Sequence, residues 1–206
     1  MLMDYMEAKA LLDKYGIKSI ESAYVNSADE ALEFAKGDAI VLKVLSDKAL
    51  HKSKAGLVML NLNGENEIRQ AYSTLINRAK PYEPYKVLAQ KMSKGGVEII
   101  IGGSTDEQFG KIVLIGFGGI YVEVFKDTSL RLCPITRYDA IEMINELKSK
   151  NIITFNGKAT SRIASLLLKF SKMFVDNENI SEVDLNPVVV TPHGYAALDL
   201  RVLTKD

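Results

Sequence analysis

The first 80 residues alternate between stretches with helical spacing of apolar positions and short apolar runs typical of strands. Apolar side chains between residues 3 and 15 recur on one helical face, and Gly16 follows as a residue that readily ends a helix. Ser27, with Glu30 three residues later, forms a capping-box pattern that marks a helix start. The pattern predicts helices over 3–15, 28–36 and 65–79 and strands over 20–26, 39–45 and 57–62.

Beyond Pro81 and Pro84 the pattern changes to short apolar runs separated by pairs of glycines. Glycine pairs at 95–96, 102–103 and 118–119 are typical of tight turns in a largely antiparallel sheet. The elements predicted here are strands over 87–92, 98–102, 111–115, 120–125, 182–190 and 195–203 and helices over 136–150 and 160–174. Together the two halves of the pattern indicate two α+β lobes.

Composition and charge narrow the classes of function. Of the 206 residues, 47% are hydrophobic and 25% are charged, which excludes a disordered chain because enough apolar surface is present for a core. Lys plus Arg and Asp plus Glu number 26 each, so binding of nucleic acid through a general basic field is not expected. Cys133 is the one cysteine, and no apolar run reaches the roughly 20 residues of a membrane span. We therefore expect a soluble cytoplasmic protein that binds neither nucleic acid nor membranes.

Lys43 interrupts an apolar run that is predicted to be a buried strand. A lysine is costly to bury alone, so its ammonium either forms an ion pair, reaches the surface along its flexible stem, or meets an anion in a cleft. The last alternative suits a nucleotide phosphate because the ammonium is a compact cation. The spacing alone favours neither the structural nor the ligand-binding interpretation.

The loop after this strand gathers His51, Ser53 and Gly56 together with two lysines. The lysines would neutralise a phosphoryl group, while the Ser53 hydroxyl and the loop amides would donate hydrogen bonds to it. An imidazole in such a loop is a candidate nucleophile for phosphoryl transfer. The alternative is an ordinary solvated loop, since the Walker A pattern is absent.

Glu182, Asp184 and Asn186 alternate with apolar residues, so the three polar side chains share one face of a predicted strand. The returning strand brings Asp199 and Arg201, again two positions apart, to what is expected to be the same face. Carboxylate and amide oxygens suit Mg²⁺ that is held together with phosphate oxygens. The alternative is a solvent-exposed polar face, but the apolar residues that follow indicate a mostly buried hairpin.

Two weaker signals lie within predicted strands. Gln90-Lys91-Met92 and Glu98 are candidates to line a nucleotide pocket, although most stretches of this kind are ordinary sheet. The sequence contains no zinc-spaced set of Cys and His and no Rossmann fingerprint.

Taken in order, these motifs resemble the ATP-grasp β subunit of ADP-forming acyl-CoA synthetases, the archaeal type of acetate–CoA ligase that is related to succinyl-CoA synthetase. The resemblance covers essentially the whole chain and rests on Val41-Leu-Lys43, Leu50-His-Lys-Ser53, Gly56-Leu-Val58, Gln90-Lys-Met92, Glu98-Ile-Ile-Ile-Gly102, Asp106, Phe109-Gly110, Gly118-Gly-Ile-Tyr-Val-Glu123, Asp184-Leu-Asn-Pro187 and Leu198-Asp-Leu-Arg201. It implies an α+β, ATP-grasp fold with a nucleotide cleft between two lobes, the smaller spanning 20–88 and the larger spanning 1–19 and 89–206.

In that family the reaction converts acyl-CoA, ADP and phosphate into the acid, ATP and CoA, through an acyl phosphate and a phosphohistidine. The resemblance therefore implies Mg²⁺ and ADP or ATP as ligands. It also implies a CoA-binding α subunit as partner, with a phosphorylated histidine on a mobile segment, in an α₂β₂ assembly.

Carried over position by position, the resemblance implies that His51 relays the phosphoryl group and that Glu182 and Asp184 lie near the incoming phosphohistidine. The implied Mg²⁺ ligands are Asn186 and Asp199. The implied nucleotide-binding residues are Lys43 at the phosphates, Gln90, Lys91 and Met92 at the adenine, Glu98 near the ribose, and Ser53 and Gly56 in the loop.

One position departs from the family pattern, because Lys54 follows the His-Lys-Ser motif where the family usually has Asp. This change adds positive charge beside His51. Two other functions stay open: an ATP-grasp ligase that forms an acyl phosphate without a phosphohistidine, and a non-catalytic nucleotide-binding regulatory subunit. The joint presence of Lys43, Asn186 and Asp199 argues against the regulatory subunit.

Overall fold

The structure is a computed structural model that describes residues 1–48, 55–119 and 127–205. The chain forms two compact units, one of Ile20–Lys94 and one that combines Met1–Ser19 with Gly95–Asp206. The predicted boundary at residue 88 is wrong in detail, because it falls inside a strand, Lys86–Lys91, that is hydrogen-bonded within the first unit. The predicted strand over 120–125 lies outside the described residues.

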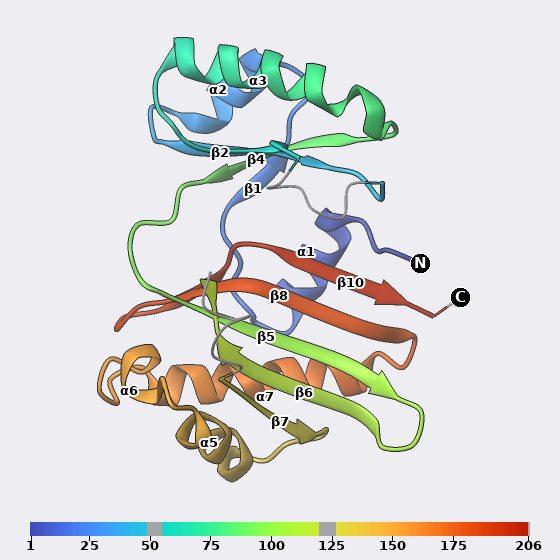
Figure 1. Ribbon diagram of the computed structural model, residues 1–206, viewed down its shortest axis with the longest axis vertical. Helices are drawn as coiled ribbons and strands as arrows, with labels where there is room; N and C mark the ends of the chain where they lie inside the picture. The colour runs from blue at the N-terminus through green and yellow to red at the C-terminus, as the bar shows by residue number, and fades with distance from the viewer. Residues whose placement is uncertain (49–54, 120–126, 206) are drawn as a thin grey trace. The chain divides into compact units, whose positions relative to one another are not determined.

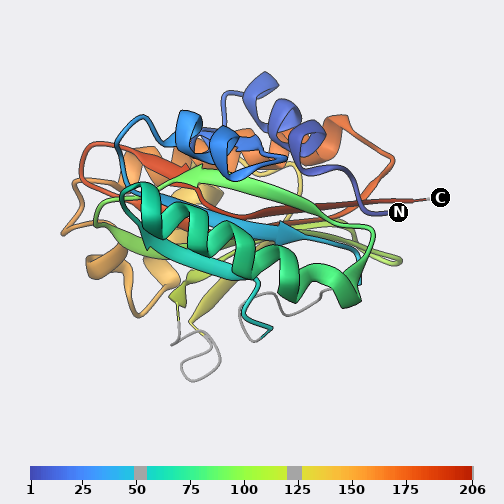
Figure 2. The same cartoon turned by 90° about the horizontal axis from the view of Figure 1, so that it is seen from above.

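The unit of residues 20–94 is a four-stranded antiparallel sheet with two helices on one face (Figure 1). Its strand order is β1-β4-β2-β3, where β1 is Ser22–Tyr24, β2 is Ile40–Leu45, β3 is Val58–Leu62 and β4 is Lys86–Lys91. The helices are α2, Ala28–Ala35, and α3, Glu65–Ala79, which lie side by side over the sheet (Figure 2) and are followed by a 3₁₀ turn at Lys80–Tyr82. Their apolar faces and the sheet enclose a core that includes Ala31, Leu42, Val44, Leu75 and Ala89.

Helix α2 begins where the capping-box pattern predicts. The Ser27 hydroxyl accepts a hydrogen bond from the backbone N–H of Glu30 at 3.1 Å. The Glu30 carboxylate, however, accepts from the backbone N–H of Asn26 at 2.8 Å, one residue before the cap. Both bonds satisfy backbone donors that have no partner within the helix.

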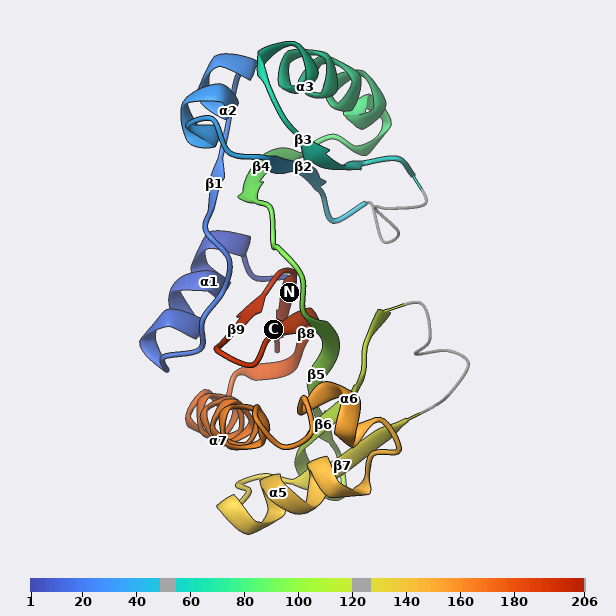
Figure 3. The same ribbon diagram turned by 90° about the vertical axis from the view of Figure 1, so that its left-hand side faces the viewer.

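The second unit contains a six-stranded sheet in which β10-β8-β5-β6-β7 are neighbours and β9 pairs with β8. Helices α5 and α7 cover one face of this sheet (Figure 3). The strands are β5 Val97–Asp106, β6 Gly110–Phe117, β7 Thr128–Leu132, β8 Ile180–Val190, β9 Tyr195–Ala197 and β10 Leu200–Thr204. The helices are α1 Tyr5–Lys14, α5 Arg137–Glu146, α6 Lys150–Ile153 and α7 Thr160–Asp176. In the described part of the chain, every helix is too short or too polar to cross a membrane.

The glycine pair at 102–103 does not form the predicted turn. Both residues lie within β5, and a Cβ atom on Gly103 would lie 3.0 Å from ring atoms of Phe170 and Phe174 on α7. Glycine is needed here because the helix packs closely on the strand. Close approach of another element is a common reason for glycine inside a strand. The pair at 95–96 precedes β5 with positive φ angles, as a turn requires.

Three other predictions need correction. The helix that begins at the Thr136–Asp139 capping box ends at Glu146, and a separate short helix follows at Lys150–Ile153. The strand predicted over 195–203 divides into β9 and β10 around Asp199. Strand β7, at the edge of the sheet, was not predicted at all.

Candidate functional site

Lys43 lies in the middle of β2 and is buried, with 8% of its surface exposed. Its neighbours Leu42 and Val44 belong to the core beneath α2 and α3. Because successive side chains of a strand point to opposite faces, Lys43 projects from the face of the sheet that the two helices do not cover. Val58 of β3 and Leu88 of β4 flank it in register.

Gln90 of β4 projects from the same face as Lys43. It pairs with Val41, and Leu88 pairs with Lys43, so Gln90 and Lys43 are diagonal neighbours on adjacent strands. The Gln90 amide donates to the Ser22 hydroxyl of β1 at 3.1 Å, and 2% of the residue is exposed. The structure therefore brings two of the predicted nucleotide ligands together on one sheet face.

Lys91 points to the opposite face from Gln90. Its ammonium donates to the Ala35 carbonyl oxygen at 2.8 Å and pairs with Asp38 at 3.0 Å, at the C-terminal end of α2. Cations stabilise helix C-termini, so this side chain has a structural role. The Lys91 side chain therefore lies among the residues that cover the helix end, and its role as a nucleotide ligand stays a prediction.

Met92 follows at the end of β4 and is partly buried. Its backbone N–H donates to the Ala39 carbonyl oxygen at 3.1 Å, and the N–H of Lys91 donates to Glu21. Both amides are thus used within the sheet, which leaves the carbonyl oxygens and the Met92 side chain as the groups that would recognise a base.

Gly56 ends the segment that contains the predicted phosphate loop, whose His51 and Ser53 lie outside the described residues. Gly56 has a φ of +65°, and its carbonyl oxygen accepts from the Arg78 guanidinium at 3.0 Å. A Cβ atom at this position would lie 2.9 Å from that guanidinium. The backbone conformation and the contact with Arg78 both require glycine here.

In the other unit, the β8 hairpin forms the polar face that the sequence predicts. Val183 and Leu185 of β8 are buried, and Glu182, Asp184 and Asn186 alternate with them. Since Gly103 pairs with Val183 and packs against α7, the three polar side chains lie on the sheet face that α7 does not cover.

Asn186 and Asp199 are linked through the backbone of this hairpin. The Asn186 N–H donates to the Asp199 carbonyl oxygen at 3.2 Å. One oxygen of the Asp199 carboxylate accepts from the N–H of Leu200 at 3.1 Å. The two implied metal ligands are therefore cross-strand neighbours where β9 gives way to β10.

Asp184 is the most perturbed carboxyl group among the described residues. Burial, followed by the negative charges of Glu182 and Asp199, raises its pKa to about 6, and only Arg201 acts in the opposite direction. Arg201 stands directly across from Asp184 on β10. A group of like charges that is costly to ionise in this way is typical of sites that bind a cation or receive a proton.

The oxygen atoms of this hairpin fit a Mg²⁺ ion that is bound by the protein and by substrate phosphates together. Within residues 1–48, 55–119 and 127–205, no three His, Cys, Asp or Glu side chains converge on one point closely enough to hold a metal ion by themselves. Mg²⁺ is typically bound through one or two protein oxygens, with phosphates and water completing its shell. The Asp199 carboxylate and the Asn186 amide supply such a pair.

Glu98 lies at the start of β5, opposite Val189 of β8, and is exposed. Its carbonyl oxygen accepts from the N–H of Gly118 at 2.8 Å. A Cβ atom on Gly119 would lie 3.2 Å from the Glu98 carboxylate. Glu98 is therefore placed beside the glycine pair that precedes the undescribed residues 120–126, and it belongs to a different unit from Gln90.

Two residues of this face were not among the predicted site residues. Arg201 was placed on the face by its spacing from Asp199, and its position opposite Asp184 adds the cation of the cluster. Gly102 pairs with Asp184 of the neighbouring strand, and a Cβ atom there would lie 3.9 Å from its nearest neighbour, the Val183 carbonyl oxygen. The sequence signal for Gly102 was hidden because the glycine pair has the appearance of a turn.

Comparisons with known proteins agree with these features. Residues 1–203 match a family model described as an ATP-grasp domain. The β subunit of acetate–CoA ligase [ADP-forming] I from Pyrococcus furiosus is 35% identical over 96% of this chain and 89% of that protein. The chain belongs to the ATP-grasp family of ADP-forming acetate–CoA ligase β subunits. The predicted family and the predicted α+β, ATP-grasp fold are confirmed.

Other relatives of this ATP-grasp chain are longer. Acetate–CoA ligase [ADP-forming] I from Archaeoglobus fulgidus is 40% identical over 96% of the chain, which spans only 30% of that protein. Among solved structures, dinucleotide forming acetyl-coenzyme A synthetase 1 from Ca. Korarchaeum cryptofilum, with coenzyme A and Ca-AMPCP, has a TM-score of 0.90 and 37% identity, covering 100% of this chain and 93% of that one. A second structure of that protein holds Mg-AMPPCP, and its phosphohistidine segment points towards the nucleotide binding site; its TM-score is 0.85 and its identity 36%, covering 99% and 93%.

Proposed function

We propose that this chain is the nucleotide-binding subunit of an ADP-forming acyl-CoA synthetase, with acetyl-CoA as the model substrate. In this reaction acyl-CoA, ADP and phosphate yield the acid, ATP and CoA. The step assigned to this chain transfers a phosphoryl group from a phosphohistidine of the partner to ADP, with a histidine of this chain as the relay. The observation that carries the proposal is the oxygen-rich face of Glu182, Asp184, Asn186 and Asp199, in a chain that matches β subunits over most of their length.

Lys43 is proposed to bind the nucleotide phosphates. Its side chain projects from the face of its sheet that α2 and α3 do not cover, and a point charge there would neutralise part of the phosphate charge. Gln90, on the same face, and the carbonyl oxygens of Lys91 and Met92 are proposed to contact the adenine. Glu98 is proposed to lie near the ribose.

Asn186 and Asp199 are proposed to hold Mg²⁺ together with the nucleotide phosphates. When bound, the ion would neutralise charge that develops on the transferred phosphoryl group. The hairpin holds the two residues next to each other, because the Asn186 N–H donates to the Asp199 carbonyl oxygen at 3.2 Å. Their side-chain oxygens therefore start from neighbouring backbone positions. A related structure with Mg-AMPPCP supports the choice of ion.

Glu182 and Asp184 are proposed to orient the imidazole ring that carries the phosphoryl group. A carboxylate that accepts the N–H of an imidazole fixes both its tautomer and its direction. His51 is proposed as the residue of this chain that relays the group, with Ser53 and Gly56 donating to its oxygens. The partner is proposed to be a CoA-binding α subunit with its own carrier histidine, in an α₂β₂ assembly. The phosphohistidine segment of the related synthetase and the naming of relatives as β subunits support this partner.

The test is reconstitution with the CoA-binding subunit encoded by the same genome, acetyl-CoA, ADP, phosphate and Mg²⁺. We expect ATP to form with wild-type chain and to fall by at least 100-fold with His51→Ala, while His193→Ala, which changes the other histidine, has wild-type activity. Acid-labile label from phosphorylated partner on His51 would support the relay. ATP formation that is unchanged by His51→Ala would favour an ATP-grasp ligase that forms an acyl phosphate without phosphohistidine.

A further inference from the structure

Strand β7 reverses the usual arrangement of apolar and polar side chains. Leu130 and Leu132 are exposed, at 55% and 53%, whereas Ser129 between Thr128 and Leu130 is buried. Buried polar and exposed apolar side chains on one strand are both unfavourable in isolation. A shift of the strand by one residue would exchange the two faces, so something holds this register.

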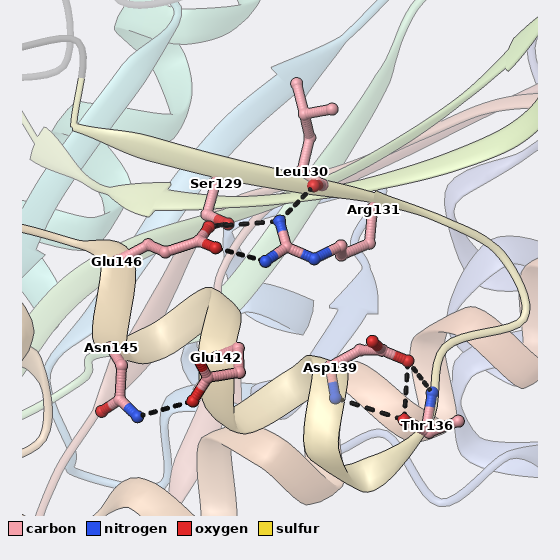
Figure 4. Close-up of polar contacts among 8 residues, drawn as sticks. All are labelled: Ser129, Leu130, Arg131, Thr136, Asp139, Glu142, Asn145 and Glu146. Carbon is pink, nitrogen blue, oxygen red and sulfur yellow. Dashed lines mark hydrogen bonds and ion pairs between the residues drawn. The ribbon is translucent and has the colours of Figure 1, made fainter.

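A polar network with α5 fixes the register of β7 (Figure 4). The Ser129 hydroxyl donates to the Glu146 carboxylate at 2.5 Å, and the Arg131 guanidinium binds the same carboxylate through both of its terminal nitrogens. In Figure 4 the Leu130 side chain points away from this network. The network therefore keeps both leucines on the side of the sheet that α5 does not cover.

The neighbouring strand extends this apolar surface. Leu130 pairs with Leu114, and Leu132 pairs with Ile112, while Val113 and Ile115 of β6 are buried on the other face. We call the four residues Ile112, Leu114, Leu130 and Leu132 the leucine face. Ile112 and Leu114 are partly buried and join the two exposed leucines into one apolar patch. Apolar patches of this kind mark sites of protein–protein contact.

The leucine face is continuous with the acidic face of β8. Strand register gives one row across the sheet that consists of Leu130, Leu114, Gly102, Asp184 and Arg201. A parallel row leads from Leu132 through Ile112 and Ser104 to Glu182. With strands about 4.8 Å apart, Leu130 is about 14 Å from Asp184, and Gly102 places no side chain between Leu114 and Asp184.

We infer that the leucine face is the docking surface for the CoA-binding partner, an inference that rests on the proposed function. The protein that binds there has to bring a phosphorylated imidazole to Glu182 and Asp184. The leucine face is an apolar surface of the same sheet, so a short segment of a protein bound to it could reach both carboxylates. In the longer relatives, where this chain is 30% of the protein, the remaining polypeptide is more than twice its size and is large enough to cover both surfaces. A second copy of this chain would cover the acidic rows without supplying the carrier histidine of the CoA-binding subunit.

The experiment measures binding of the CoA-binding subunit from the same genome by sedimentation velocity and calorimetry. The test variant is Leu130→Asp/Leu132→Asp, and the matched control is Ile152→Asp, an apolar residue of α6 that is 57% exposed. We expect at least a tenfold weaker complex for the double variant and less than a twofold change for the control. Binding of MgADP to each isolated chain should be unchanged, which shows that the variants are folded.

Hydrogen exchange of the wild-type complex gives a second readout that does not depend on the variants. Residues 110–117 and 128–132 should become protected when the partner binds. If the double variant binds the partner like wild type, or if it loses self-association instead, the leucine face is not the partner surface, although the proposed function stands. If the wild-type chain does not bind the partner, both the docking surface and the proposed function are wrong.

Discussion

Asp184 and Arg201 stand directly opposite each other on β8 and β10, on the face that also presents Glu182 and Asp199. The guanidinium is the one cation among the groups that shift the pKa of Asp184, and it does not offset burial and two negative neighbours. The isolated chain therefore holds a carboxyl group that is costly to ionise, as expected of a site whose charge is balanced by a bound cation.

The first prediction concerns pH and stability. The pKa of Asp184 is about 6 in the folded chain and 3.8 as its ordinary value. An acid with the higher pKa in the folded state binds its proton more tightly there, so its stabilising contribution is complete below about pH 4 and is lost as the pH rises through about 6. Asp184→Asn should therefore be more stable than wild type at pH 7.5, by on the order of 1–3 kcal/mol.

Urea denaturation at pH 4 and pH 7.5 checks this prediction. The two chains should have nearly equal free energies of unfolding at pH 4 and should differ at pH 7.5. Glu107→Gln, which changes an exposed carboxylate, is the control and should follow wild type at both values. A constant difference across the pH range would show that the effect of the Asp184 substitution is not one of ionisation.

The second prediction separates two lysines on adjacent strands. Lys43→Met should weaken MgADP binding by roughly 10- to 100-fold, the range of a lost charge-assisted hydrogen bond. Lys91→Met should lower the free energy of unfolding by about 1 kcal/mol, since it removes the contacts with Ala35 and Asp38, and should leave nucleotide affinity within twofold. Calorimetry and thermal unfolding of both variants test this. Equal losses of affinity would contradict the different roles.

The third prediction uses the adjacent glycines of β5. Gly103→Ala should destabilise the chain by about 1–3 kcal/mol, because its Cβ would lie 3.0 Å from the rings of Phe170 and Phe174. For Gly102→Ala the nearest heavy atom is 3.9 Å away, so stability should change by less than about 0.5 kcal/mol. Chemical denaturation of the two variants is the measurement. If Gly102→Ala proves the more damaging, the assignment of sheet faces is wrong.

The fourth prediction concerns the network that fixes β7. Glu146→Ala leaves the buried Ser129 hydroxyl without its carboxylate partner, which should cost about 1–3 kcal/mol. Glu142→Ala, one turn earlier on α5 and half-buried, is the matched control; its carboxylate accepts a 3.3 Å hydrogen bond from Asn145 at the surface, so its loss should cost less than about 0.5 kcal/mol. Similar unfolding midpoints for the two variants would show that the network does not hold the strand.

Most of the elements could be predicted from the sequence because their periodicity agrees with their burial. Helix α3 and strands β2 and β3 lie within one residue of the predicted bounds. Helix α3 buries a regular apolar face and β2 is buried along most of its length, whereas β3 is only partly buried and is predicted by its apolar run alone. Strand β7 could not be found in this way. Its apolar residues are exposed and its polar residues are held by Glu146, a partner 15–17 positions away that no local pattern reveals.

The candidate site shows the same division. The period of two at Glu182, Asp184 and Asn186 was sufficient to place them on one strand face. Local sequence could not reveal that the Lys91 side chain belongs to the end of α2, because that contact joins residues 53–56 positions apart. The predicted roles of His51 and Ser53, in the loop outside the described residues, stay predictions.

The most direct test of the central claim is a crystal structure of this chain with MgADP. We predict that the Lys43 ammonium contacts a phosphate oxygen of ADP and that Mg²⁺ is bound by the Asn186 amide oxygen and the Asp199 carboxylate. A nucleotide whose phosphates contact none of these three side chains would contradict the account.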